Sequence, residues 1–410
     1  MKILHISVHE GVDRRFIGMM NHSVRQGHDV AFLSLPIDLN GSGLDSRVMV
    51  VSAPLEGSGR KTSFRKRVRR FVRESLMRLP AWLSGPVYWR IIERRDSKRF
   101  MHFDAMRVSN IPDFVPDIVH VHDLRAVPYA LAFRPCWSGV KIIYDAHEFT
   151  PFEWGNRKIK KDLVDYERKV VRSVDAVIAV NCGIAHAMAR LYQIPEPEVL
   201  LNSAEPLPDE IPCTDGEFLR HFSMDDLDGN SVRVLFPGSI TAWRNVECLI
   251  RAFDLLPPHI HLFVLGFWDM VSHMKEISGK NVHFGPPVSP SRLLGFTRHA
   301  TFGVIPYLAD RCLNNELCTP NKLFEFIEAG VPVCSSKLPE VERILSTDGN
   351  GACFSMQTPD EIAKAILTMC RRLEQGDFGR EALDAARAKY SYASQMLVLD
   401  EIYRKLACAE

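Results

Sequence analysis

Two loops that follow predicted buried strands carry residue types suited to holding an anion. Gly238 and Arg244 follow the apolar run at residues 232–236. Glycine lets the backbone approach a ligand closely, and an arginine at a strand-to-helix connection can clamp a phosphate. Taken alone, these residues are explained better by an ordinary loop with a solvated arginine. This motif alone therefore does not assign a site.

The second loop follows the apolar run at residues 302–305. Pro320 is expected at the first position of a helix, with Lys322 beside it and Glu325 one turn further along. Helix N-termini bind phosphate through free amides and the helix dipole, and a carboxylate at Glu325 can accept both hydroxyls of a ribose. The alternative is a structural helix with a solvated acid near its positive end. The place of this segment, directly after a strand, favours a ligand site.

Histidines end two predicted strands of the first half. His120, His122 and Asp123 close one strand, and His147 and Glu148 close another. Alternate residues share one face of a strand, so a metal site at His-x-His-Asp is one interpretation. One strand offers too few ligands, and we expect no metal ion. His120 is expected to be a core histidine.

The loop after the first strand contains charged residues at positions 9–16. Asp13, Arg14 and Arg15 could contact a ligand, but an ordinary helix start with Asp13 as its N-cap explains them nearly as well.

Short Val- and Ile-rich runs alternate with helical patterns along the chain. This alternation predicts parallel sheets with crossover helices, the doubly wound α/β architecture. The 410 residues suffice for two such domains, and five prolines mark residues 193–214 as the linker. The predicted strands are residues 3–8, 30–35, 118–121, 142–144 and 176–180, then 232–236, 261–265, 282–284, 302–305 and 331–335.

Composition excludes several classes of protein. With 46% hydrophobic and 25% charged residues, the chain is a folded globular protein rather than a disordered one. No apolar run is long enough to span a membrane, and residues 1–6 lack a secretory signal pattern. The ten cysteines contain no Cys-x-x-Cys and are expected to be reduced thiols of a cytoplasmic protein. Neither a G-x-G-x-x-G nor a P-loop motif is present.

The motifs, taken together and in order, resemble those of a known family. The run at residues 320–326, with 329–333 behind it, resembles the donor-site signature of the GT-B retaining glycosyltransferases of family 4. Residues 175–181, 201–203 and 238–244 resemble further segments of that family in the expected order. Residues 390–392 and 399–403 look like its C-terminal helices, which return to the first domain. The resemblance covers nearly the whole chain except residues 40–110.

The resemblance implies two Rossmann-like domains facing across a cleft, at residues 1–205 (with a basic insertion at about 55–105) and 206–390, and a helix at 391–410 that packs back on the first domain. It implies that Glu325 binds ribose and that Arg244 holds the donor diphosphate. A UDP-sugar is the expected co-substrate, with a GDP-sugar second, and no other cofactor is expected. The implied catalytic residues are His147, Arg244, Lys322 and Glu325. The implied donor-binding residues are Gly238, Ser239, Arg244, Gly285, Val288, Thr319, Pro320, Asn321, Lys322, Leu323 and Glu325. The implied acceptor-binding residues are Gly11, Asp13, Arg14, His122 and Glu148.

Two positions depart from the family pattern. Ser239 stands where the family has the first arginine of its phosphate clamp, and Leu317 stands where it has the first glutamate of an E-x7-E motif. Three hypotheses therefore remain open. The first is an active, metal-independent, retaining glycosyltransferase of glycan or polysaccharide synthesis. The second is an inactive subunit that binds a nucleotide sugar or a partner, and the third is a sugar-nucleotide epimerase.

A basic segment at residues 60–99 carries fourteen Lys or Arg against three acids, although the whole chain has a net charge of +1. Apolar residues recur in it at helical spacing, which is typical of a helix on an anionic membrane surface. A grip on an acidic acceptor, or a solvated helix packed on its own domain, explains it as well. No nucleic-acid reader motif accompanies the charge. The expected location is cytoplasmic, with peripheral membrane contact as an option.

Overall fold

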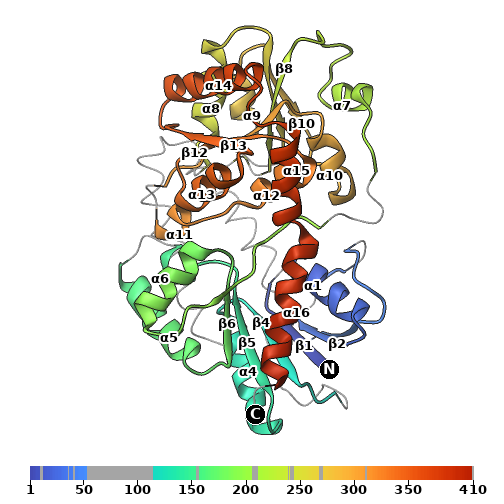
Figure 1. Cartoon of the computed structure of the whole chain (residues 1–410), viewed down its shortest axis with the longest axis vertical. Helices are drawn as coiled ribbons and strands as arrows, with labels where there is room; N and C mark the ends of the chain where they lie inside the picture. The colour runs from blue at the N-terminus through green and yellow to red at the C-terminus, as the bar shows by residue number, and fades with distance from the viewer. Residues whose placement is uncertain are drawn as a thin grey trace, which may run out of the picture. The chain divides into compact units, whose positions relative to one another are not determined.

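The computed structural model describes the chain except for residues 10–12, 36, 40–41, 53–113, 154–156, 206–210, 239, 241–243, 267–270, 310–311 and 409–410. The described residues form two compact units (Figure 1). The first contains Met1–Leu200 and Met396–Glu410, and the second contains Leu201–Gln395. The basic segment, Gly11 and Ser239 lie outside the described residues.

The first unit is built on a seven-stranded parallel sheet in the order β3-β2-β1-β4-β5-β6-β7. Its central strands are almost fully buried, as expected for a parallel sheet covered on both faces. The strands are β1 (Lys2–Ser7), β2 (Asp29–Ser34), β3 (Met49–Ser52), β4 (Ile118–His122), β5 (Lys141–Ala146), β6 (Ala176–Ala179) and β7 (Glu198–Val199). The helices are α1 (Arg14–Arg25), α4 (Val127–Phe133), α5 (Arg157–Val171) and α6 (Cys182–Tyr192).

The second unit has a six-stranded parallel sheet in the order β10-β9-β8-β11-β12-β13. Two buried apolar clusters flank it. The strands are β8 (Val232–Pro237), β9 (Ile260–Leu265), β10 (Val282–Gly285), β11 (Phe302–Ile305), β12 (Val333–Ser336) and β13 (Gly351–Phe354). The helices are α7 (Asp215–His221), α8 (Val246–Ala252), α9 (Val271–Glu276), α10 (Pro290–Thr297), α11 (Leu313–Glu316), α12 (Asn321–Ala329), α13 (Pro339–Asp348), α14 (Pro359–Glu374) and α15 (Arg380–Lys389).

The fold class predicted from the sequence is confirmed. Every predicted strand is present, and both sheets are parallel. The strands β3, β7 and β13 are not among the predicted ones; they lie at sheet edges and have two to four residues each. The observed boundaries between the units fall after Leu200 and Gln395.

The last helix, α16 (Tyr392–Cys408), packs against the first unit as predicted. The hydroxyl of Tyr403 lies 2.8 Å from Nδ1 of His120, and both side chains are buried. Asp400 lies 2.9 Å from Nε2 of His22 on α1. Buried polar contacts of this kind fix the position of a helix because each partner would be costly to leave unpaired.

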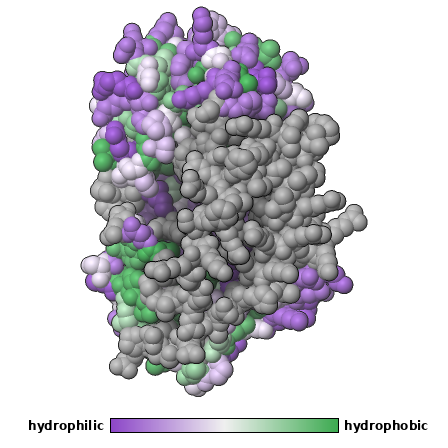
Figure 2. All heavy atoms as spheres, turned by 180° about the vertical axis from the view of Figure 1, so that it is seen from behind, coloured by the Kyte–Doolittle hydropathy of each residue, from purple (hydrophilic) through white to green (hydrophobic). Residues whose placement is uncertain are grey.

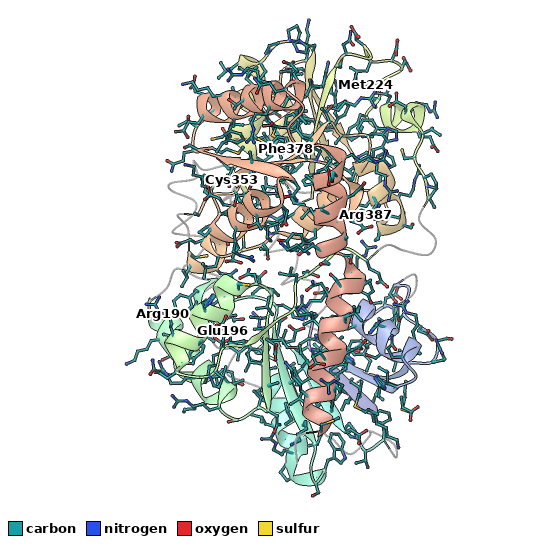
Figure 3. The ribbon with its side chains drawn as sticks, in the orientation of Figure 1. Arg190, Glu196, Met224, Cys353, Phe378 and Arg387 are labelled. Atoms are coloured by element: carbon teal, nitrogen blue, oxygen red, sulfur yellow. The ribbon has the colours of Figure 1, made fainter. Side chains whose placement is uncertain are left out.

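Helices of the second unit are joined by a similar contact. Arg387 on α15, labelled in Figure 3, donates to Oε1 of the nearly buried Glu328 on α12 at 2.7 Å. The pair fixes α12, the helix that carries Lys322 and Glu325, against its neighbour.

All ten cysteines are free thiols. In the part of the chain that the structure describes, no helix combines the length and apolarity that crossing a bilayer requires. On the face drawn in Figure 2, hydrophilic residues dominate one end, and hydrophobic residues gather in a smaller area nearer the other.

A buried carboxyl group lies between α5, β5 and α6. Glu167 is fully buried and accepts hydrogen bonds from the hydroxyls of Tyr144, at 2.6 Å, and Tyr192. Burial raises the pKa of Glu167 to about 7, although the two hydroxyls partly oppose this.

We expect Glu167 to make stability depend on pH. Because its pKa is raised in the folded state, the free energy of unfolding should fall by about 3 kcal/mol as the pH rises from about 4.5 through 7. Glu167→Gln mimics the protonated acid and should remove this component. Urea unfolding at pH 5 and pH 8 measures it, with Asp162→Asn, exposed on the same helix, as the control. Equal pH dependence in wild type and Glu167→Gln would contradict the assignment.

Candidate functional site

The site in the second unit begins where β8 ends. Gly238 has φ +107, a conformation that favours glycine, and its amide donates to the carbonyl of Leu265 at 2.8 Å. A Cβ at Gly238 would lie 3.7 Å from Nη1 of Arg244 and 3.8 Å from Nζ of Lys322. The turn therefore holds bare backbone beside two cationic side chains, one from the connection between β8 and α8 and the other from the first turn of α12.

The two cations rest on aromatic rings. Nζ of Lys322 lies 3.5 Å from the ring centroid of Phe236 and 5.1 Å from that of Tyr307, and the Arg244 guanidinium also lies 5.1 Å from the Tyr307 ring. These distances are those of cation–π contacts. The rings give the cations partial stabilisation without neutralising their charge.

Lys322 is unusual because it is only 5% exposed, and its Nζ has no hydrogen-bond partner among the described residues. Burial and, secondarily, the charge of Arg244 hold the pKa of Lys322 well below its usual range, while Glu325 opposes the shift. A buried ammonium without a partner is costly, and an anion bound beside it would offset that cost. We call the place where Gly238, Arg244 and Lys322 meet a corner of the second unit, and its chemistry is that of an anion site.

The predicted residues around this corner fall into two groups. Gly238, Arg244, Lys322 and Glu325 come together, since Glu325 acts electrostatically on both Lys322 and Tyr307. Helix α12 begins at Asn321, so Pro320 is its N-cap rather than its first residue. Thr319 precedes this cap and is buried.

The other predicted donor residues have structural partners of their own. The Leu323 side chain is completely buried in the core, so only its backbone could meet a ligand. A Cβ at Gly285 would lie 2.6 Å from Cδ2 of His221 and 2.8 Å from Cε1 of Phe222, so packing within the unit requires this glycine. Val288 packs against the same core. Asn321 is exposed and accepts a hydrogen bond from Asn202 at 2.8 Å.

Of the two departures from the family pattern, Leu317 lies in the described part of the chain and Ser239 does not. Leu317 caps the short helix α11, and Glu316 before it is exposed. Ser239 lies outside the described residues, so its role stays a prediction.

In the first unit, the carboxyl ends of β1, β4 and β5 meet in a cluster of histidines and carboxylates. Nε2 of His147 lies 3.1 Å from Nδ1 of His122 and 3.3 Å from Oδ2 of Asp145. Its Nδ1 lies 3.6 Å from Oδ2 of Asp13. Burial lowers the pKa of His147, but the charges of Asp123 and Asp145 and the carboxylate contacts outweigh it and raise the pKa well above its usual value.

A buried ion pair lies behind this cluster. Arg15 donates to Asp145 from Nη2 at 2.9 Å and from Nε at 3.2 Å, and its Nη1 donates to the carbonyl of Leu200. Bidentate pairs of this kind fix both side chains. Arg15, considered above as a ligand contact, instead has a buried structural role. The pairing partner lies 130 residues away, and no local pattern indicates it.

The predicted acceptor residues lie at different depths. Asp13 caps α1 and also faces His147, whose contacts keep the pKa of Asp13 far below its usual value although burial alone would raise it. Arg14 and Glu148 are exposed. His122 is completely buried between His5, at 3.0 Å, and His147, so it supports His147 and does not lie where an acceptor could touch it. Gly11 lies outside the described residues.

Two sets of side chains in the described part of the chain have metal-ligand chemistry. One comprises His9, Asp123 and His147, and the other comprises the fully buried His120, His122 and Asp145. Counting ligands on one strand missed the first set, because its members follow three different strands. The signal in the sequence was a histidine or aspartate after each strand end.

Two protein-family models match the chain and together cover more than half of it. The model described as "Glycosyl transferase 4-like domain" matches residues 10–203, and the model described as "Glycosyl transferases group 1" matches residues 231–372. A search of curated protein sequences gave no match.

Solved structures with the same fold cover the full length of the chain. A glycosyltransferase from Rickettsia africae has a TM-score of 0.67 and 13% identity, over 100% of this chain and 99% of that one. HepE from Anabaena in complex with UDP has a TM-score of 0.65 and 12% identity, over 100% of both chains. WaaG, a glycosyltransferase involved in lipopolysaccharide biosynthesis, has a TM-score of 0.56 and 12% identity, over 99% and 100%. At these identities the likeness establishes the GT-B fold and no more.

The buried ammonium yields a prediction about stability. Lys322→Met puts an apolar side chain of similar length at this buried position and removes the cost of burying an unpaired charge, so the free energy of unfolding should rise by about 1 kcal/mol or more. Urea unfolding measures this, and Lys337→Met, at an exposed position of the same unit, is the control. A loss of stability on Lys322→Met would show that the ammonium is well paired.

Proposed function

This chain belongs to the glycosyl transferases of group 1, which move a sugar from a nucleotide sugar, and we propose that its donor is a UDP-sugar and its acceptor a hydroxyl of a saccharide or lipid-linked saccharide. The proposed products are bacterial-type glycans or polysaccharides. The observation that carries the proposal is the pair of cations, Arg244 and Lys322, beside the bare backbone of Gly238.

The donor diphosphate is proposed to bind between Arg244 and Lys322. A diphosphate offers several anionic oxygens, so it can accept from the guanidinium and the ammonium together. Glu325, one turn along α12 from Lys322, is proposed to accept the ribose hydroxyls. The turn at Thr319 and Pro320 and the loop from Gly285 to Val288 complete the proposed donor contacts. The UDP bound to HepE, which has the same fold, supports this choice of ligand class.

Catalysis is proposed to depend on positive charge around the leaving group. When the bond between sugar and diphosphate breaks, negative charge grows on the phosphate, and fixed cations lower the energy of that state. With Arg244 and Lys322 in this role, we propose transfer that is metal-independent and retains the anomeric configuration. His147, a charged histidine that follows the carboxyl end of β5, is proposed to contact the donor sugar. Asp13, Arg14 and Glu148 remain proposed acceptor contacts.

The proposed location is the cytoplasm, since ten free thiols fit a reducing compartment. Peripheral contact with an anionic membrane is proposed for the basic segment at residues 60–99, on its sequence alone.

Experiments with purified protein distinguish a glycosyltransferase from the two alternatives, an inactive subunit and an epimerase. An inactive subunit would bind nucleotide without turning over any nucleotide sugar. An epimerase would convert the donor when no acceptor is present. A thermal-shift screen of nucleoside diphosphates identifies the base first, because at equal ligand concentration the ligand with the lowest dissociation constant raises the unfolding temperature most.

Arg244→Ala should lower the rate of sugar transfer at least about 100-fold, because one of two cations at the leaving phosphate is removed. Transfer is measured by release of the nucleoside diphosphate, and circular dichroism should show an unchanged fold. Arg251→Ala is the matched control, since Arg251 is exposed on α8 and pairs with Glu247 on the same helix. Retained activity in Arg244→Ala would contradict the proposed role.

A further inference from the structure

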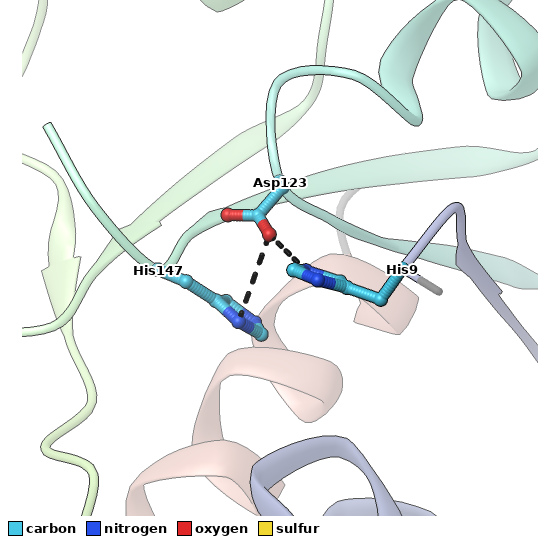
Figure 4. A group of neighbouring side chains, drawn as sticks. All are labelled: His9, Asp123 and His147. Carbon is cyan, nitrogen blue, oxygen red and sulfur yellow. Dashed lines mark hydrogen bonds and ion pairs between the residues drawn. The ribbon is translucent and has the colours of Figure 1, made fainter. Parts of the chain in front are cut away.

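Three side chains that follow three adjacent strands converge at the carboxyl ends of the strands of the first sheet (Figure 4). His9 follows β1, Asp123 follows β4 and His147 follows β5. Their ligand atoms all lie within 4.8 Å of one another. Nε2 of His9 contacts Oδ2 of Asp123, and Nδ1 of His147 lies 4.0 Å from the same oxygen. Two imidazoles and one carboxylate form the ligand set that binds divalent transition-metal ions in many proteins.

The residues behind the cluster orient His147 for coordination. Its Nε2 lies 3.3 Å from Oδ2 of Asp145, and Arg15 fixes that carboxylate by a bidentate contact. A carboxylate on one ring nitrogen sets the tautomer and leaves the other nitrogen for a metal ion. In His147 that other nitrogen is Nδ1, the one that faces Asp123.

The backbone holds Asp123 in an uncommon conformation that aims its carboxylate. Its φ is +68, which costs energy for a residue other than glycine and marks a functional position in many proteins. The amide of Asp123 donates to the carbonyl of Asp145 at 2.9 Å, so the same residue that orients His147 also anchors Asp123.

Charge and access both suit a cation from solvent. Asp13 lies 3.6 Å from Nδ1 of His147, so a second carboxylate faces the same space. The negative charges of Asp13 and Asp123 attract a cation to this space. The side chain of His9 is 40% exposed, against 16% for Asp123 and 10% for His147.

The neighbouring set of His120, His122 and Asp145 does not share these properties. All three are completely buried, and Arg15 occupies both carboxylate oxygens of Asp145 with its own positive charge. A second cation there would meet repulsion from the guanidinium. The set of His9, Asp123 and His147 is therefore the better candidate for a metal site.

We propose that His9, Asp123 and His147 bind one divalent transition-metal ion of the Zn²⁺ type, and that this ion inhibits sugar transfer by occupying His147. Coordination takes the lone pairs of two neutral imidazoles, and a proton carried by His147 is released to solvent when the ion binds. The inhibition rests on the proposed function, in which His147 contacts the donor sugar, whereas the binding site does not. Mg²⁺ prefers oxygen ligands and should bind poorly.

Equilibrium dialysis of the full chain against Zn²⁺ or Co²⁺ at pH 7.5, after treatment with a chelator, tests the site. Wild type should bind one ion, with a Co²⁺ absorption spectrum that reports coordination by nitrogen and oxygen. His9→Gln should weaken binding at least about 10-fold with an unchanged unfolding temperature. His186→Gln, at an exposed histidine 3.2 Å from Glu196 in the same unit, is the matched control and should bind as wild type does.

Binding that survives His9→Gln would overturn the site. His261 and His283, whose ring nitrogens lie 3.1 Å apart in the second unit, are the rival ligands. Loss of binding in His283→Gln but not in His9→Gln would place the ion there and contradict the proposal. Absence of any stoichiometric binding by wild type would also overturn it.

Zn²⁺ added to the transfer assay separates the role of the site from its existence. Wild type should be inhibited at the concentrations that fill the site, and His9→Gln should need at least about 10-fold more Zn²⁺ for the same inhibition. Binding without inhibition would overturn the inhibitory role. If no nucleotide sugar is turned over at all, the proposed function fails, and the dialysis result still decides the site.

Discussion

The second unit is organised around the buried ammonium group of Lys322. It lies over the ring of Phe236, beside Arg244, without a hydrogen-bond partner among the described residues. Such an arrangement lowers stability unless an anion binds there, so it is a feature of a site rather than of a core. The turn at Gly238, the aromatic platform of Tyr307 and the ion pair that fixes α12 each serve to keep this cation in place.

The first unit is organised around a buried negative charge instead. Asp145 pairs with Arg15 and contacts His120, His122 and His147, so one carboxylate orders the ends of two strands. Around it the histidines take different states. Burial lowers the pKa of His122 to about 3, whereas carboxylates raise that of His147. The two neighbouring imidazoles therefore differ in protonation. His122 is a buried neutral support, and His147 is a charged group nearer the surface.

The sequence predicted what depends on local pattern. Buried parallel strands and helix starts have local signals, so the fold class and the loops at Gly238 and Pro320 could be found without a structure. The short strand β7 has no apolar run, and the pairing of Arg15 with Asp145 or of His9 with Asp123 joins residues more than a hundred positions apart. Such pairs depend on β4 lying between β1 and β5, an order that no local pattern specifies.

Affinity for UDP compared with uridine tests the central claim most directly, because the two ligands differ only in the diphosphate. With two cations at the site, UDP should bind wild type about 100-fold more tightly than uridine by isothermal titration calorimetry. In Lys322→Met that difference should shrink at least about 10-fold, while the affinity for uridine stays the same. Equal affinity for UDP and uridine in wild type, or an unchanged difference in Lys322→Met, would contradict the claim that this buried cation is a phosphate site.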